Sequence, residues 1–226
     1  MTLPDLTELQ PSLELAEAAC LAYDDPNFFA SNIQARILRR NGVTIIAPAG
    51  SNDTHDWVQN FEAILVQRGH GRTFKGFAEM GDISRESFLA YIKSFPGPWE
   101  FGAHSAGCAV ALQWALWMAE AGMVPSRVQL LAAPTIWDAA GAAYYQTFNI
   151  PTLRIAMYQD PIAALPGLER GGAYESPMLI LDPDGHEREK QDLPANWNVI
   201  ELAMDAAKCH PMPHYLRGIR CFLQAG

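Results

Sequence analysis

The chain has 226 residues, of which 49% are hydrophobic and 18% are charged, as in an ordinary globular protein. This length predicts one domain, residues 1–226, with a sizeable core. The formal net charge of −9 argues against nucleic acid or an anionic membrane surface as a partner, and the first residues lack the basic and apolar stretches of a secretory signal, so we expect a cytoplasmic location.

The N-terminal part of the chain predicts a helix followed by a β-hairpin. Leu and Ala recur at helical spacing over residues 5–23, which predicts an amphipathic helix. Two strands are expected at residues 33–40 and 43–47. Asn41-Gly42 joins them and is a strong signal for a tight two-residue hairpin.

A loop at residues 48–53 is expected to lead into a further helix. Asp53 or Thr54 can cap its N-terminus. Its apolar face would carry Trp57, Phe61, Ile64 and Leu65.

The rest of the chain alternates short apolar strands with helices. The expected order is a helix centred on residues 87–95, a strand from residue 99, a helix over 109–120, strands at 128–132, 151–157 and 178–181, and a helix over 214–222. This alternation predicts an α/β fold with a mostly parallel central sheet flanked by helices.

The most specific motif is Ala103-His104-Ser105-Ala106-Gly107, which has the form G-x-S-x-G with Ala in the first Gly position. It predicts a nucleophile elbow, in which a strand turns sharply into a helix with Ser105 at the apex. Small residues are needed around Ser105 so that strand and helix can approach each other. Residues 102–119 carry no Lys, Arg, Asp or Glu, but the motif indicates a buried helix there and not a membrane span.

A serine nucleophile needs a carboxylate and a histidine later in the chain, at the same edge of the sheet. Asp160 is the best acid, since it closely follows the strand at 151–157; Asp138, Asp182 and Asp184 compete with it.

His210 and His214 are the candidate bases. Pro211 disfavours helix at His210, so His210 is expected on a loop from which it can reach over the sheet edge. His186 lies in a charged, solvated segment, and His55 and His70 precede the serine.

Metal and cofactor sites are not expected. None of Cys20, Cys108, Cys209 and Cys221 has the spacing of metal ligands, and whether Cys209 and Cys221 pair is left open. A metal-dependent hydrolase using Asp182, Asp184 and His186 is an alternative, although that run has the composition of a turn.

An ordered set of short motifs over residues 43–216 resembles the class 3 lipases, the fungal-type branch of the α/β-hydrolase superfamily. The set consists of Gly50-Ser51, Asp56-Trp57, Asn60, Gly76-Phe77, the elbow at Ser105, Asp160-Pro161, Leu165-Pro166 and the run from His210 to Tyr215. Tyr215 falls five residues after His210, as in the family pattern, which favours His210 over His214.

The resemblance implies Ser105 as the nucleophile, Asp160 as the acid and His210 as the base. Ser51 would be the oxyanion-hole residue, its N–H acting together with that of Ala106.

The resemblance also implies a short lid helix at residues 54–61. Its Trp57 and Phe61 would cover the site, meet acyl chains or contact a lipid interface; ordinary core packing is the alternative for that face. His104 is expected to pack in the elbow and to line the substrate site.

The expected activity is therefore hydrolysis of acylglycerols or related carboxylic esters through an acyl-enzyme, without a cofactor. Two alternatives stay open. One is a phospholipase or acyltransferase with the same triad, and the other is a non-catalytic hydrolase-fold protein that binds an apolar ligand.

Overall fold

The computed structural model of the chain describes residues 11–50, 64–165, 171–189 and 210–225. Their main feature is an eight-stranded sheet with the strand order β1-β2-β3-β6-β7-β8-β9-β10. The strands are β1 (Phe28–Ala30), β2 (Ile33–Arg40), β3 (Val43–Pro48), β6 (Trp99–His104), β7 (Arg127–Leu131), β8 (Thr152–Met157), β9 (Met178–Leu181) and β10 (Glu187–Arg188). Pairing is parallel from β3 to β9 and antiparallel at both edges, which confirms the mostly parallel sheet predicted from sequence.

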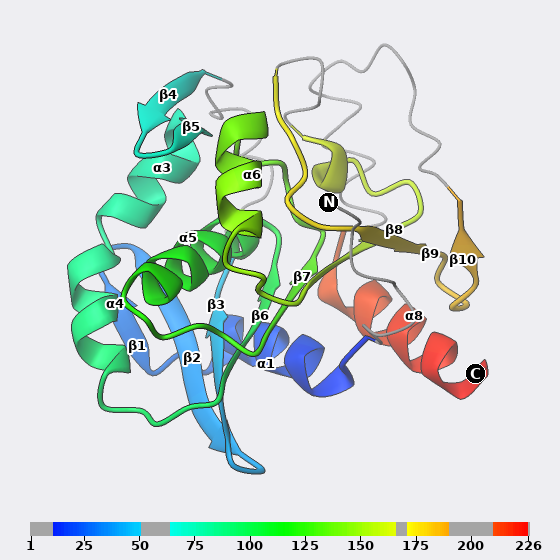
Figure 1. The fold of residues 1–226 in the computed structure, drawn as a ribbon. Coiled ribbons are helices and arrows are strands. Elements are labelled where there is room, and N and C mark those ends of the chain that lie inside the picture. Colours follow the sequence, from blue (N-terminus) through cyan, green and yellow to red (C-terminus); the bar gives the residue numbers. More distant parts are fainter. Residues whose placement is uncertain (1–10, 51–63, 166–170, 190–209, 226) are drawn as a thin grey trace.

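Helices cover both faces of this sheet (Figure 1). On one face lie α1 (Leu13–Asp24) and α8 (Met212–Ala225), from opposite ends of the chain. On the other face α5 (Ala106–Glu120) packs against the central strands and is itself covered by α3 (Lys75–Asp82) and α4 (Arg85–Ile92). A small hairpin of β4 (Leu65–Arg68) and β5 (Gly71–Phe74) lies beside α3 and α6 (Ala139–Gln146).

The core beneath α5 is dense and aromatic. Trp114 of α5 is fully buried and stacks on Phe88 of α4, with ring centroids 3.9 Å apart, and its indole N–H donates to Ser84. Burial of one such side chain contributes about 2–3 kcal/mol to stability. These contacts hold α5, and with it the elbow at its N-terminus, in one position on the sheet.

α1 lies against the opposite face through a run of small residues. Ala16, Ala19 and Ala22 are fully buried, so the helix backbone approaches the sheet closely. Ser12 caps the helix by accepting from the Leu15 N–H, so the helix begins later than the predicted residue 5; residues 5–10 lie outside the described part. The buried Gln129 of β7 pairs with both the N–H and the C=O of Ser12, which fixes the start of α1 on the central sheet.

The predicted hairpin is confirmed. Asn41 and Gly42 both have positive φ, 51° and 82°, as a type I′ turn requires, and they pair β2 with β3 in antiparallel register.

The helix predicted to reach Ile64 and Leu65 is wrong at that end, because Leu65 begins β4. An apolar run of this length fits a helix or a strand equally well, and pairing with β5 decides the outcome. The helix expected around residues 87–95 ends at Ile92, and a separate helix, α3, precedes it.

Candidate active site

The chain turns sharply from β6 into α5 at Ser105, which has φ 57° and ψ −134°. A non-glycine residue rarely adopts this backbone conformation, so the surrounding structure must hold it. The Ser105 N–H donates to the Leu131 carbonyl of β7 at 2.9 Å, and Ser105 is 1% exposed. These features are those of a nucleophile elbow, as the motif predicted.

The N-terminus of α5 lies directly against the end of β3. A Cβ atom on Gly107 would come within 2.5 Å of the Pro48 carbonyl oxygen, so only glycine permits this approach. The contact places Ala49 and Gly50, which follow β3, beside the elbow. Ala106 is the first residue of α5, and its N–H therefore has no acceptor within the helix.

Asp160 lies three residues beyond the end of β8 and is fully buried. Its Oδ2 accepts from the Tyr215 hydroxyl at 2.7 Å and pairs with His210 Nδ1 at 3.0 Å, while its Oδ1 accepts from the Ile162 N–H at 2.9 Å. Burial acts to raise the pKa of this carboxyl, but the interactions with His210, Tyr215 and the Ile162 N–H outweigh it and lower the pKa. Asp160 is therefore a carboxylate held in its charged form.

His210 lies just before α8 and is 4% exposed. Because its Nδ1–H donates to the Asp160 carboxylate, the lone pair of the neutral imidazole is on Nε2. Among the described residues, neither His210 Nε2 nor Ser105 Oγ has a hydrogen-bond partner, although both atoms are buried. A proton transfer from serine to histidine requires these two groups, a hydroxyl and a nitrogen that can accept its proton. The hydrogen bond between such groups is often long before substrate binds.

Tyr215 has a role that its place in the motif did not reveal. Its hydroxyl donates to Asp160 and accepts from the Met157 N–H at 3.0 Å. Through this side chain, α8 helps to orient the carboxylate. Burial, followed by the charge of Asp160, raises the pKa of the Tyr215 hydroxyl, which keeps it protonated as a donor.

His104 was expected to line the substrate site, and its nitrogens are not available for that purpose. The residue is 4% exposed, its Nδ1 contacts the Tyr23 hydroxyl at 3.0 Å and its Nε2 contacts the His210 carbonyl oxygen at 2.9 Å. Burial, reinforced by the nearby His210, lowers the pKa of His104 to about 3. The imidazole is thus neutral and bonded on both sides within the protein.

The competing acids have other partners. Asp138 caps α6 and pairs with Arg72 at 2.8 Å. Asp182 accepts from two backbone N–H groups of its own turn and from Arg188, and Asp184 pairs with Arg217. Within the described ranges, no group of three His, Cys, Asp or Glu side chains is arranged to hold a metal ion.

Several predicted site residues lie outside the described residues. They are Ser51, Trp57, Phe61 and the remainder of residues 54–61, together with Cys209. In the part of the chain that is described, no helix is both long and apolar enough to cross a membrane.

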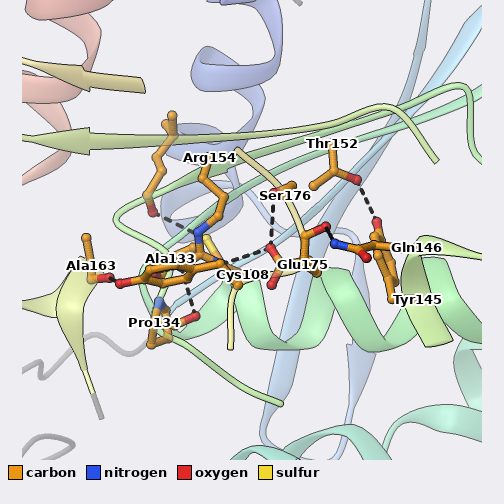
Figure 2. A network of polar contacts seen from close by, with 12 residues as sticks. Cys108, Ala133, Pro134, Tyr145, Gln146, Thr152, Arg154, Ala163, Glu175 and Ser176 are labelled. Atoms are coloured by element: carbon orange, nitrogen blue, oxygen red, sulfur yellow. Dashed lines mark hydrogen bonds and ion pairs between the residues drawn. The ribbon is translucent and has the colours of Figure 1, made fainter. Parts of the chain in front are cut away.

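A second buried charge cluster, not foreseen from the sequence, surrounds Arg154 of β8 (Figure 2). Arg154 pairs with Glu175 at 2.9 Å, and the two side chains are 1% and 0% exposed. The guanidinium also donates to the carbonyls of Ala133 and Pro134, in the segment that follows β7. One sequence signal existed, since Arg154 is the sole charged residue in a strand that is otherwise apolar except for Thr152.

Comparison with known proteins shows the family and the fold of the chain. The family model for class 3 lipases matches residues 45–170, more than half of the chain. A search of curated proteins found no match.

Solved lipase structures share the fold. The native Rhizomucor miehei lipase propeptide complex is 17% identical, with a TM-score of 0.70 over 93% of this chain and 80% of that one. A triacylglycerol lipase whose catalytic centre is formed by a serine protease triad is 18% identical, with a TM-score of 0.69 over 99% of this chain and 98% of its own. Lipase II from Rhizopus niveus is 14% identical, with a TM-score of 0.60 over 69% and 63% of the two chains.

Proposed function

The chain belongs to the class 3 lipases, serine ester hydrolases of the α/β-hydrolase fold, and we propose that its catalytic triad is Ser105, His210 and Asp160. The observation that carries this assignment is the buried hydrogen bond between His210 Nδ1 and Asp160 Oδ2. It fixes the tautomer of His210 that can act as a base at Nε2. His210 packs on His104, which directly precedes Ser105, with ring centroids 4.5 Å apart.

In the first half of the reaction, Ser105 Oγ attacks the ester carbonyl and its proton passes to His210 Nε2. The charged Asp160 stabilises the imidazolium that forms. Negative charge develops on the carbonyl oxygen, where the N–H groups of Ala106 and Ser51 would donate to it. The bond to the alcohol then breaks, and His210 returns its proton to the leaving alcohol, which leaves an acyl group on Ser105.

In the second half, water takes the place of the alcohol. His210 removes a proton from the water, and the resulting hydroxide attacks the acyl carbonyl. Collapse of this intermediate releases the carboxylic acid and restores the Ser105 hydroxyl. Each proton removed by His210 is given back within the same cycle, so no cofactor is consumed.

We propose acylglycerols as the substrates, met at a lipid interface through residues 54–61. The apolar residues Trp57 and Phe61 support this contact, as do the triacylglycerol lipases among the similar structures. The net charge of −9 supports a partner other than nucleic acid.

The experiment that tests the function compares wild type with Ser105→Ala on p-nitrophenyl esters from acetate to palmitate and on a triacylglycerol emulsion. We expect the substitution to reduce kcat by about 10³-fold or more, because the triad acts as a unit. A fluorophosphonate probe should label wild type and not the variant. Equal activity of the two folded proteins would overturn the assignment of Ser105, and a preference for short soluble esters would replace acylglycerols as the substrate class.

A further inference from the structure

The hydroxyl of Tyr23, near the end of α1, lies between two parts of the candidate site. On one side it contacts His104 Nδ1 at 3.0 Å. On the other side it packs directly against the backbone of Gly50, where an added Cβ atom would lie 2.3 Å from the hydroxyl oxygen. His104 continues the connection, because its Nε2 lies 2.9 Å from the carbonyl oxygen of His210. Four segments that are distant in sequence are thereby joined in one line.

Every hydrogen bond in this line has only one possible direction. A carbonyl oxygen can only accept, so His104 must carry its proton on Nε2 and donate it to His210. Nδ1 of the neutral ring is then an acceptor, and the Tyr23 hydroxyl must donate to it. The line runs from Tyr23 through His104 to His210 without a conflict of donors or acceptors. At its other end the Tyr23 hydroxyl packs against the backbone of Gly50.

The packing around Gly50 is too close for any side chain. A Cβ atom there would lie 2.3 Å from the Tyr23 hydroxyl oxygen, 2.8 Å from the His104 carbonyl oxygen and 3.2 Å from Ser105 Cβ. The backbone of Gly50 is therefore in direct contact with the elbow. Since Gly50 immediately precedes Ser51, its position sets where the proposed oxyanion-hole segment begins.

We propose that Tyr23 and His104 are positioning residues that tie the Gly50 segment to the backbone of His210, so that oxyanion hole, elbow and base keep one relative geometry. This inference rests on the proposed function. Neither residue touches the reacting atoms; both act through the groups that do.

The state of the two side chains fits this role. His104 is enclosed by the rings of Tyr23, His210 and Tyr215, with centroids 6.1, 4.5 and 5.5 Å away. Its pKa, lowered by burial to about 3, keeps it neutral beside His210, so it does not repel the imidazolium that forms during the reaction. Burial raises the pKa of the Tyr23 hydroxyl, which therefore remains a donor.

The first test is Tyr23→Phe, with Tyr145→Phe as the matched control. Tyr145 is also a buried tyrosine with a bonded hydroxyl, to Thr152 at 2.8 Å, but it lies in α6 away from the line. We expect Tyr23→Phe to lower kcat by about 10- to 100-fold with little change in KM, since small misplacements of catalytic groups have effects of this size. Tyr145→Phe should lower Tm and leave kcat unchanged. Equal kcat values for the two folded variants would overturn the proposal.

The second test uses the two amides that imitate different halves of His104. In His104→Gln the side-chain amide N–H can still donate to the His210 carbonyl. In His104→Asn the shorter amide can still accept from the Tyr23 hydroxyl, but it cannot reach His210. We expect Tyr23→Phe combined with His104→Asn to lose no more kcat than the more damaging single variant, because both break the same line. Multiplicative losses would mean that the two residues act independently and would contradict the proposal.

A third measurement does not depend on activity. Nitrogen-15 NMR of the histidine rings should show His104 in wild type as the neutral tautomer protonated on Nε2, with a changed Nδ1 shift in Tyr23→Phe. Protonation of His104 on Nδ1 in wild type would leave Nε2 unable to donate to the His210 carbonyl, and would overturn the proposal. Failure of the proposed function would appear separately, as activity that survives Ser105→Ala while these NMR signatures stay intact.

Discussion

Asp160 and Glu175 are both buried carboxylates associated with strand β8, but their partners differ in kind. Asp160 is surrounded by a hydroxyl, a backbone N–H and the imidazole of His210. Glu175 faces the permanent cation of Arg154 and accepts from Ser176. The first carboxylate has no fixed counter-charge among these contacts, whereas the second is neutralised at all times.

This difference separates a catalytic charge from a structural one. Because Asp160 lacks a fixed cation, its field is available to stabilise the imidazolium when His210 takes a proton. The charge of Glu175 is balanced by Arg154, which also donates to the carbonyls of Ala133 and Pro134 after β7. Burial and charge alone do not distinguish Asp160 from Glu175 as the catalytic carboxylate. The partner of each carboxylate makes the distinction.

The strongest way to break the comparison is Asp160→Asn. The amide keeps the shape of the side chain but lacks the charge and favours the wrong tautomer of His210. We expect kcat to fall by roughly 10⁴-fold. Ester hydrolysis and far-UV circular dichroism would be measured together, and a folded variant with near-normal kcat would show that Asp160 is not the triad acid.

Glu175→Gln should have the opposite profile. Removing the charge leaves the Arg154 guanidinium buried without its counter-ion, so we expect the free energy of unfolding to fall by about 3–5 kcal/mol. Urea denaturation measures this loss, while kcat per folded molecule should stay unchanged. Adding Arg154→Met should recover part of the stability. A fall in kcat without a fall in stability would place Glu175 in the catalytic machinery.

Tyr215→Phe sharpens the comparison with a smaller change. The variant loses the hydrogen bond to the charged Asp160 and the one from the Met157 N–H. For the first of these alone we expect a loss of about 1.5–3 kcal/mol in the free energy of unfolding. Because Asp160 keeps its contacts with His210 and Ile162, kcat should fall far less than in Asp160→Asn. Denaturation and steady-state kinetics on the same sample would check both values; a kcat as low as that of Asp160→Asn would mean that Tyr215 does more than orient the carboxylate.

The smallest effect concerns acid stability. The pKa of Asp160 is lower in the folded than in the unfolded chain, so its ionisation stabilises the fold fully above the unfolded value of about 3.8 and loses this effect as pH falls through the folded value. Asp160→Asn lacks this group. The stability of wild type should therefore fall more steeply below pH 4, by at most about 1.4 kcal/mol per pH unit. The free energy of unfolding would be measured against pH in both proteins. An equal slope below pH 4 would contradict the lowered pKa of Asp160.

The parts of the fold that the sequence predicted are those encoded by neighbouring residues. The hairpin at Asn41-Gly42, the strands β2, β7, β8 and β9 and the turn at Ser105 each depend on local backbone preference or a largely apolar run. The chain order of serine, acid and histidine also predicted Asp160 and His210 as partners, and the structure brings them together.

The missed parts depend on contacts between distant segments. Nothing around Tyr23 or Glu175 in the chain indicates a partner, and only the packing of α1 on the elbow or of the segment before β9 on β8 supplies one. The hairpin of β4 and β5 was missed because its apolar residues fit a helix equally well. For His104, adjacency to Ser105 suggested a substrate contact, but it could not reveal that both ring nitrogens are already occupied.

The placement of α1 has a consequence for the order of events during folding. The Tyr23–His104, His104–His210 and Ser12–Gln129 contacts join residues 81, 106 and 117 positions apart. Contacts of such long range form late, because the intervening chain must first be ordered. During synthesis the serine elbow would thus be complete well before the base is in place, and hydrolytic activity would report that α1 and α8 have both docked onto the sheet.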